Sequence, residues 1–393
     1  MRSNSTDYKN VQLLLLLCND TFTEDQKALA REMAPAIKDW EAFSGLAIEN
    51  GIAAIVSVNI EECGITESVP QKVLDKLEAL RNKTLARVAF ISAAATDMTK
   101  LLEANGIKML LLKGLALEYT VYGGRGLRQM NDADVLIDPD HTVVAWHLLQ
   151  REGFISRPIK SPLYKRIIMC IGNHLPELHR NGISVDIHHR LFQKQGQALT
   201  QKGIDEAQEI DISGTTCFVL PPRIAFLAMI KHIQKHGIKG EFQVRLYLDL
   251  FLMLKYKSEE ILCNDLLSEA EEACVSEDLS ATLYLLSTHW DIDIPEKYFT
   301  ALSEPDKKRN SSAFMKGLNN PGKIDPERNR DIYEYNLRSV EGTVNKLIFL
   351  VGDIFPSVSF MKERYNKNSL VAILPYYLLR TGKVFWFLRA LIK

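Results

Sequence analysis

The chain has 393 residues, 46% of them hydrophobic and 25% charged, which are ordinary values for a globular protein. This length exceeds what one core usually holds, so two or three structural units are expected. The 48 basic and 49 acidic residues exclude an overall basic field and disfavour a nucleic-acid partner. The six cysteines include no C-x-x-C pair, which excludes the usual zinc and disulfide frameworks and favours a reduced, cytoplasmic protein.

The first part of the chain, residues 1–104, is predicted to be helical. Pro70–Leu102 carries apolar residues at helical spacing, and Pro70 suits the first turn of a helix. The apolar run Leu13–Leu17 is short and no small-residue cleavage site follows it, which favours a buried helix over a signal peptide. No stretch reaches the ~18–20 apolar residues that span a bilayer, so no transmembrane segment is expected.

The pattern changes at Asn105, where a core of residues 105–220 is predicted to begin. Ile107–Leu112 and Ala133–Ile137 are short apolar runs typical of buried strands, and a helix is expected between them. Asn181-Gly182 separates two strand-like segments, which is a strong hairpin signal. Alternating strands and helices followed by a hairpin predict a mixed sheet, and the fold class is therefore α+β, with helical regions on both sides of the sheet core.

The last part, residues 221–393, is predicted to be helical again. Residues 303–330 are polar and rich in glycine and proline, so an exposed loop is expected there. The apolar tail Leu370–Lys393 is expected to be buried against the N-terminal helices, and an interfacial membrane helix is the alternative.

Three acidic residues carry the candidate chemistry. Asp132 and Asp134 stand two apart at the start of a predicted strand, so their side chains emerge on one face. Two carboxylates that close repel each other unless a cation lies between them, and Mg²⁺ prefers such oxygen ligands together with substrate phosphates. Asp186, flanked by Val185 and Ile187, is the candidate third ligand. The alternatives are a solvated strand end for the first pair and a salt-bridged strand aspartate for Asp186.

The stretch from Leu111 to Ile137 resembles a bacterial family described as uncharacterised nucleotidyltransferases, within the DNA polymerase beta-like superfamily. It reads Leu-Lys-Gly, then Gly-Leu-Arg-x-Met-x-Asp-x-Asp-x-Leu, and Val185–His188 matches a later family segment. The resemblance implies a nucleotidyltransferase fold, an NTP substrate, and two Mg²⁺ ions held by the three aspartates. It also implies that the third acid, Asp186, neighbours the attacking oxygen. Leu115 stands where superfamily members carry a serine.

Four further residues are candidates for contact with the nucleotide. The backbone amides of Lys113 and Gly114 are suited to bind a phosphate. The alternative is that this segment is only the start of a helix, with Lys113 on the surface. Arg128 could clamp a triphosphate or pair with Asp132. His188 shares a strand face with Asp186 and could touch substrate or support a metal ligand, or it is a packed histidine. Among the helical residues after the sheet, Lys235 and Arg245 are outside candidates for the same pocket, with His232, His236 and Asp249 expected to be structural.

These residues predict a metal-dependent transfer of a nucleoside monophosphate from an NTP, such as ATP, to an acceptor hydroxyl. The neutral net charge favours a small molecule, peptide or glycan precursor as the acceptor. Two alternatives stay open: an enzyme that adds the nucleotide to a partner protein, and a nucleotide-binding module without turnover.

Overall fold

The computed structural model describes residues 4–321, 329–340 and 342–391, and side chains for residues 9–193, 195–321, 333–340 and 342–380. Five helices precede the sheet, of which the fifth is the longest. They are α1 (Asn4–Leu16), α2 (Glu24–Met33), α3 (Trp40–Glu49), α4 (Ala53–Glu62) and α5 (Gln71–Glu103). The sheet region contains three more helices, α6 (Lys113–Thr120), α7 (Pro139–Arg151) and α8 (Gln197–Asp205).

Every strand of the described residues lies between residues 109 and 219, and the seven strands form one sheet. They are β1 (Met109–Leu111), β2 (Asp132–Ile137), β3 (Ile155–Ser156), β4 (Leu178–Arg180), β5 (Ile183–His188), β6 (Gln208–Ile212) and β7 (Thr215–Val219). Their order is β3-β4-β5-β2-β1-β7-β6. The pairs β2–β5 and β1–β7 are parallel and the other pairs are antiparallel. The predicted α+β class, with a mixed sheet flanked by helices, is confirmed.

Two hairpins close parts of the sheet, and only one of them was predicted. Asn181 and Gly182 join β4 to β5 with φ values of 50° and 78°, the left-handed conformations that a tight two-residue turn requires. Ser213 and Gly214 do the same between β6 and β7, at 53° and 79°. The Ser-Gly pair was the available signal for this second hairpin.

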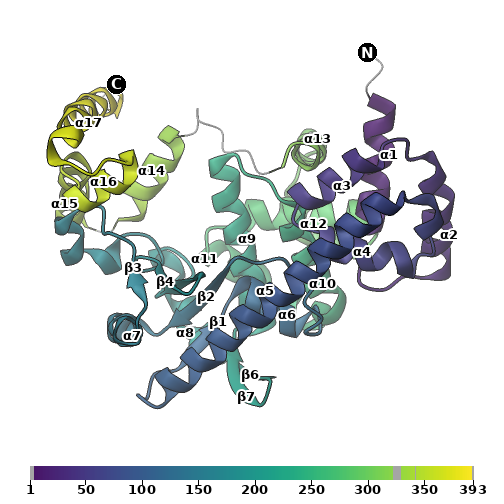
Figure 1. The fold of residues 1–393 in the computed structure, drawn as a ribbon, viewed down its shortest axis with the longest axis horizontal. Helices are drawn as coiled ribbons and strands as arrows, with labels where there is room; N and C mark the ends of the chain where they lie inside the picture. Colours follow the sequence, from purple (N-terminus) through teal and green to yellow (C-terminus); the bar gives the residue numbers. More distant parts are fainter. Residues whose placement is uncertain (1–3, 322–328, 341, 392–393) are drawn as a thin grey trace.

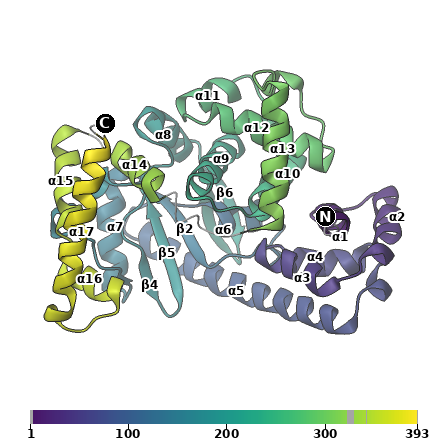
Figure 2. The ribbon, with the colours of Figure 1, turned by 90° about the horizontal axis from the view of Figure 1, so that it is seen from above.

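The helices after the sheet pack on one of its faces and around its edge. They are α9 (Pro222–Lys239), α10 (Val244–Ile261), α11 (Leu266–Glu272), α12 (Ser276–Trp290), α13 (Glu304–Asn319), α14 (Asn329–Ser339), α15 (Thr343–Ile354), α16 (Val358–Tyr365) and α17 (Leu370–Leu391). α9, α10 and α12 share one hydrophobic core with α1, α3 and α4. α5 and α7 cover the opposite face of the sheet in a second core. Figures 1 and 2 show α15, α16 and α17 together at the end of the molecule away from α1 and α2.

Two expectations for the last part of the chain are wrong. Of the loop expected at 303–330, residues 304–319 instead form α13, because Ser303 caps the helix and its apolar face, with Phe314 and Leu318, is buried. Residues 322–328 of that expected loop lie outside the described residues. The described part of the tail also does not pack against the N-terminal helices: α17 packs against α15 and α16, and Leu370, Val371 and Leu374 are 58%, 77% and 59% exposed. The side chains of residues 381–393 lie outside the described residues, so that half of the prediction stands untested.

No single described helix has both the length and the apolar composition to cross a bilayer. The consecutive helices α15 and α16 pass the same criteria only as a pair, with a bend of 54° between them.

Candidate functional site

The candidate site is built on the two parallel strands at the centre of the sheet. β2 and β5 pair in a register that sets Asp134 directly beside Asp186, and Asp132 beside Ser184. Side chains of residues two apart in a strand share a face, so Asp132, Asp134 and Asp186 point to the same side. The neighbouring Val135 and Ile187 point the other way, into the core under α5 and α7. The carboxylates therefore face α9 and α10.

Asp134 lies at the centre of this site and is held by two donors. Lys113 Nζ donates to Asp134 Oδ1 at 2.6 Å, and His188 Nε2 donates to the same oxygen at 2.8 Å. Burial alone would raise the pKa of Asp134, but Lys113 and His188 together hold that pKa well below its ordinary value. Burial and the Lys113 charge lower the pKa of His188 to about 3. His188 is thus a neutral ring that fixes the Asp134 carboxylate.

The pKa values of Asp132 and Asp186 are shifted in the opposite direction to that of Asp134. Burial and the neighbouring Asp134 carboxylate raise the pKa of Asp132. Burial also raises the pKa of Asp186, against the opposing effect of His174, whose Nδ1 lies 3.8 Å from Asp186 Oδ1. Within the described part of the chain, the Asp132 carboxylate makes no hydrogen bond or ion pair. Two aspartates of this site therefore favour a compensating cation.

Lys113 stands at the junction where β1 leads into α6. Its φ of 48° is in the left-handed region, which an amino acid with a side chain rarely adopts and which turns the chain into the helix. The preceding Leu112 N–H donates to the carbonyl of Asp134 at 2.9 Å, so the junction is fixed to β2. This backbone arrangement places the Lys113 ammonium beside the Asp134 carboxylate.

The next residue, Gly114, is required for a different structural reason. A Cβ at this position would lie 2.2 Å from Nη1 of Arg128, closer than any real contact, so only glycine leaves room for the guanidinium. In the predicted Lys-Gly pair, Lys113 thus places a cation beside the Asp134 carboxylate, and Gly114 lets the Arg128 guanidinium approach the backbone. Within α6, Glu118 accepts from the backbone N–H groups of Gly126 and Arg128 at 2.6 and 2.9 Å, which holds the glycine-rich loop before β2.

Arg128 pairs with Asp249 and not with Asp132, the protein partner considered from the sequence. Its Nη2 donates to Asp249 Oδ2 at 2.7 Å, and both side chains are buried, at 6% and 0% exposure. Tyr122 donates to the other Asp249 oxygen at 2.9 Å. Arg245, an outside candidate for the nucleotide pocket, instead donates to the backbone carbonyl of Gln129. Asp249 and both arginines therefore tie α10 to the loop that enters β2.

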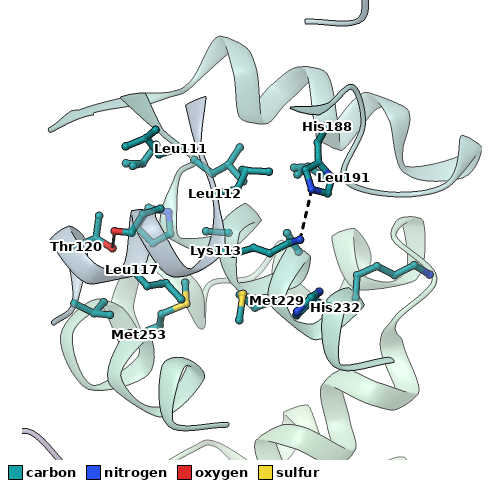
Figure 3. Close-up of a pocket in the computed structure, with 18 of the residues that line it drawn as sticks. Leu111, Leu112, Lys113, Leu117, Thr120, His188, Leu191, Met229, His232 and Met253 are labelled. Atoms are coloured by element: carbon teal, nitrogen blue, oxygen red, sulfur yellow. Dashed lines mark hydrogen bonds between the residues drawn. The ribbon is translucent and has the colours of Figure 1, made fainter. Parts of the chain in front are cut away.

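A cavity of about 340 Å³ opens between α6, α9, α10 and the sheet, and Lys113 and His188, which both contact Asp134, belong to its lining. Figure 3 shows the Lys113 side chain reaching toward His188, with His232, Thr120 and several aliphatic and methionine side chains elsewhere around this cavity. Its apolar lining includes Leu112, Leu117, Val121, Leu191, Leu220, Ala225, Ala228, Met229 and Met253. An apolar cavity with a few polar groups at one end is the usual form of a small-molecule site. The sequence did not predict this cavity, because its walls come from segments far apart in the chain.

α9 adds three basic residues, Lys231, His232 and Lys235, to the lining of this cavity. Burial and repulsion by Lys113 lower the pKa of Lys235, and the same two causes lower the pKa of His232 well below its ordinary value. In the part of the chain that the structure describes, Lys235 has no hydrogen-bonding or ion-pair partner. Two lysines that repel each other across a cavity suit a polyanionic ligand such as a triphosphate.

The oxygen donors Asp132, Asp134 and Asp186 match the ligand chemistry of Mg²⁺. The rise in the pKa values of Asp132 and Asp186 shows that added positive charge would be favourable there. The described residues nevertheless contain no cluster of three or more His, Cys, Asp or Glu side chains already gathered to hold an ion. Lys113 supplies the positive charge beside Asp134 in this structure. The donor set therefore fits a divalent cation, and its side chains have to close around one.

Comparison with known proteins places the chain in a family. A family model described as uncharacterised nucleotidyltransferase matches residues 37–291, which is more than half of the chain. The chain belongs to this family and is a nucleotidyltransferase, as the motifs around Asp132 and Asp186 predicted. No curated protein matches it.

Two solved structures show a distant likeness. One is the antibiotic-resistance factor ANT(2'')-Ia, with 9% identity and a TM-score of 0.34 over 52% of this chain and 99% of that one. The other is an antigenic nucleotidyltransferase-like protein from Paracoccidioides brasiliensis, with 15% identity and a TM-score of 0.30 over 49% of this chain and 91% of that one.

Proposed function

We propose that this nucleotidyltransferase is Mg²⁺-dependent and moves a nucleoside monophosphate from an NTP to the hydroxyl of a small acceptor. The observation that carries the proposal is the register of Asp134 beside Asp186, with Asp132 on the same strand face and Lys113 at 2.6 Å. Asp132, Asp134 and Asp186 would hold the ions. Bound Mg²⁺ supplies charge stabilisation of the entering and leaving oxygens during such a transfer.

The basic residues of the cavity rim would bind the triphosphate. Lys113 lies at the start of α6, where an ammonium and a helix N-terminus both favour negative charge. Lys235 faces it from α9 and has no carboxylate partner among the described residues. The apolar part of the cavity, about 340 Å³ in all, would enclose the nucleoside. Arg128 contributes indirectly, because its ion pair with Asp249 holds the loop that leads to Asp132.

Asp186 would act as the base for the acceptor. Burial raises its pKa, which makes it a better proton acceptor than an ordinary aspartate. The acceptor hydroxyl gives its proton to this carboxylate as its oxygen forms a bond to the α-phosphorus. The bond between that phosphorus and the bridging oxygen breaks, and pyrophosphate leaves. The buried free thiols Cys18, Cys63 and Cys217 fit the reducing cytoplasm, where we place the reaction.

Pyrophosphate release tests the proposal. The full chain is incubated with each NTP, Mg²⁺ and a fractionated small-molecule extract, and pyrophosphate and labelled product are measured. We expect Mg²⁺-dependent release that Asp186→Asn reduces by roughly 100-fold or more, while Asp205→Asn, an exposed aspartate on α8, leaves it unchanged. Absence of release with every NTP, or full release by Asp186→Asn, would overturn the proposal.

A further inference from the structure

Exposed apolar side chains gather on the last helices of the chain. Among the described residues, nine of the seventeen large hydrophobic side chains that are exposed lie between residues 344 and 379. On α17, Leu370, Val371 and Leu374 lie within one turn of each other, so they form a stripe on one side of the helix. α15 presents Val344 and Leu347, 70% and 61% exposed and three residues apart.

This apolar surface is not the unfilled core of the C-terminal helices, because they have a core of their own. Tyr164 stacks on Phe349 with ring centroids 5.5 Å apart and donates to the Phe349 carbonyl at 3.0 Å. Val340 is buried in the same cluster. A Cβ at Gly352 would lie 2.3 Å from the Tyr164 ring, which shows how closely α15 approaches the segment before β4. The inner side of α15 is thus packed, and its exposed residues face outward.

The same segment is strongly basic. Residues 343–393 contain eight lysines and arginines against two acidic residues, a side-chain net charge of +6, whereas the whole chain has −1. Asp353, one of the two acids, is buried and already paired with Lys160 and near Arg380. Lys346, Arg364 and Lys367 are exposed. Exposed positive charge and exposed apolar side chains therefore occur on the same C-terminal segment.

We propose that α15, α16 and α17 form a docking surface for an anionic lipid bilayer, on which they lie in the plane of the headgroups. Apolar side chains flanked by lysine and arginine are the composition of helices that bind such interfaces. The three helices lie together at one end of the molecule in both views, where a flat surface could reach them (Figures 1 and 2). A second copy of this chain is the less favoured occupant, because it would bring another +6 charge to the contact. Lys362, Glu363 and Arg364 within α16 favour lying on the bilayer over crossing it.

Vesicle flotation with the full chain tests this surface. We expect the protein to float with vesicles of phosphatidylcholine and phosphatidylglycerol, to stay unbound with phosphatidylcholine alone, and to detach as salt increases. The double variant Val371→Glu/Leu374→Glu should lower partitioning at least ~10-fold, since it replaces exposed apolar side chains by charges that the anionic surface repels. Leu347→Glu tests the same surface from α15. Val144→Glu, which is 52% exposed on α7, is the matched control and should bind like the parent.

Each other outcome would reject the inference. A parent chain that does not float with anionic vesicles has no lipid-docking surface, and equal binding to neutral vesicles removes the role of the basic residues. Full binding by the folded double variant, verified by circular dichroism, assigns any membrane affinity to another part of the chain. Dimerisation that the double variant abolishes, without vesicle binding by the parent, would identify a second copy as the occupant.

Discussion

Lys113 Nζ lies 2.6 Å from Asp134 Oδ1, so the cation nearest to the central carboxylate comes from the chain itself. The same ammonium lies 3.5 Å from His188 Nε2 and also repels Lys235. Lys113 is therefore positioned to compensate the charge of the Asp134 carboxylate and, in the proposed complex, to bind phosphate. Because a lysine side chain is long and flexible, it can change partner without a change in the backbone.

Lys113→Asn should weaken binding of a nonhydrolysable NTP with Mg²⁺ by roughly 10- to 100-fold, the usual effect of losing a charged hydrogen bond. Asparagine tolerates the left-handed φ of 48°, so the backbone should be preserved. Isothermal titration calorimetry measures the affinity, and Lys83→Asn, exposed on α5, is the control. Equal affinities of the two variants would show that Lys113 does not contact the nucleotide.

Asp132→Asn and Asp134→Asn should change stability in opposite directions in the absence of metal. The folded-state pKa of Asp132 is raised, so its ionisation disfavours the folded state and removing it should increase the free energy of unfolding at neutral pH. The folded-state pKa of Asp134 is lowered, so its contribution to stability is present above the ordinary aspartate pKa of 3.8 and is lost as the pH falls through the folded-state pKa. Asp134→Asn should therefore destabilise at neutral pH.

Urea unfolding across pH 3–7 checks this pair of predictions, with and without Mg²⁺. The stability difference between the parent and Asp134→Asn should shrink as the pH falls below about 4, the pKa of a free aspartate. A stabilised Asp134→Asn protein at neutral pH would mean that Lys113 and His188 do not hold this carboxylate. Both variants should lose nucleotidyl transfer under the proposed function, because each removes one ligand of the metal site.

Asp249→Asn should reduce stability by about 3–5 kcal/mol, because it leaves the buried Arg128 guanidinium without its charged partner. Thermal or urea unfolding measures the change. Glu260→Gln removes an ion pair between exposed side chains, Lys257 and Glu260, and should cost about 0–1 kcal/mol. Similar small losses in both variants would contradict the structural role given to Arg128.

Ala228→Phe should fill part of the cavity and reduce NTP affinity by at least ~10-fold, while the carboxylates stay in place. Overpacking costs about 1–3 kcal/mol, so the folded state should persist and can be verified by its melting temperature. Ala313→Phe, exposed on α13, should leave affinity and stability unchanged. Unchanged affinity in a folded Ala228→Phe protein would show that the nucleoside lies elsewhere.

The sequence by itself determined the α+β class and the position of its sheet. Short apolar runs, the Asn181-Gly182 turn and the Asp-x-Asp spacing depend on neighbouring residues only, so local patterns reveal them. The strand alternation that sets Asp132 and Asp134 on one face is likewise local. The family motifs added the expectation of nucleotidyl transfer.

Only the tertiary structure decided what each side chain meets. The pairing of Arg128 with Asp249 joins residues 121 positions apart, and no local pattern distinguishes it from a pairing with Asp132. The register that sets Asp134 beside Asp186, the cavity between α6 and α9, and the packed α13 also arise from long-range contacts. Such contacts depend on how several elements that are distant in the sequence pack together, whereas the hydrophobic periodicity of a segment indicates only the secondary structure of that segment.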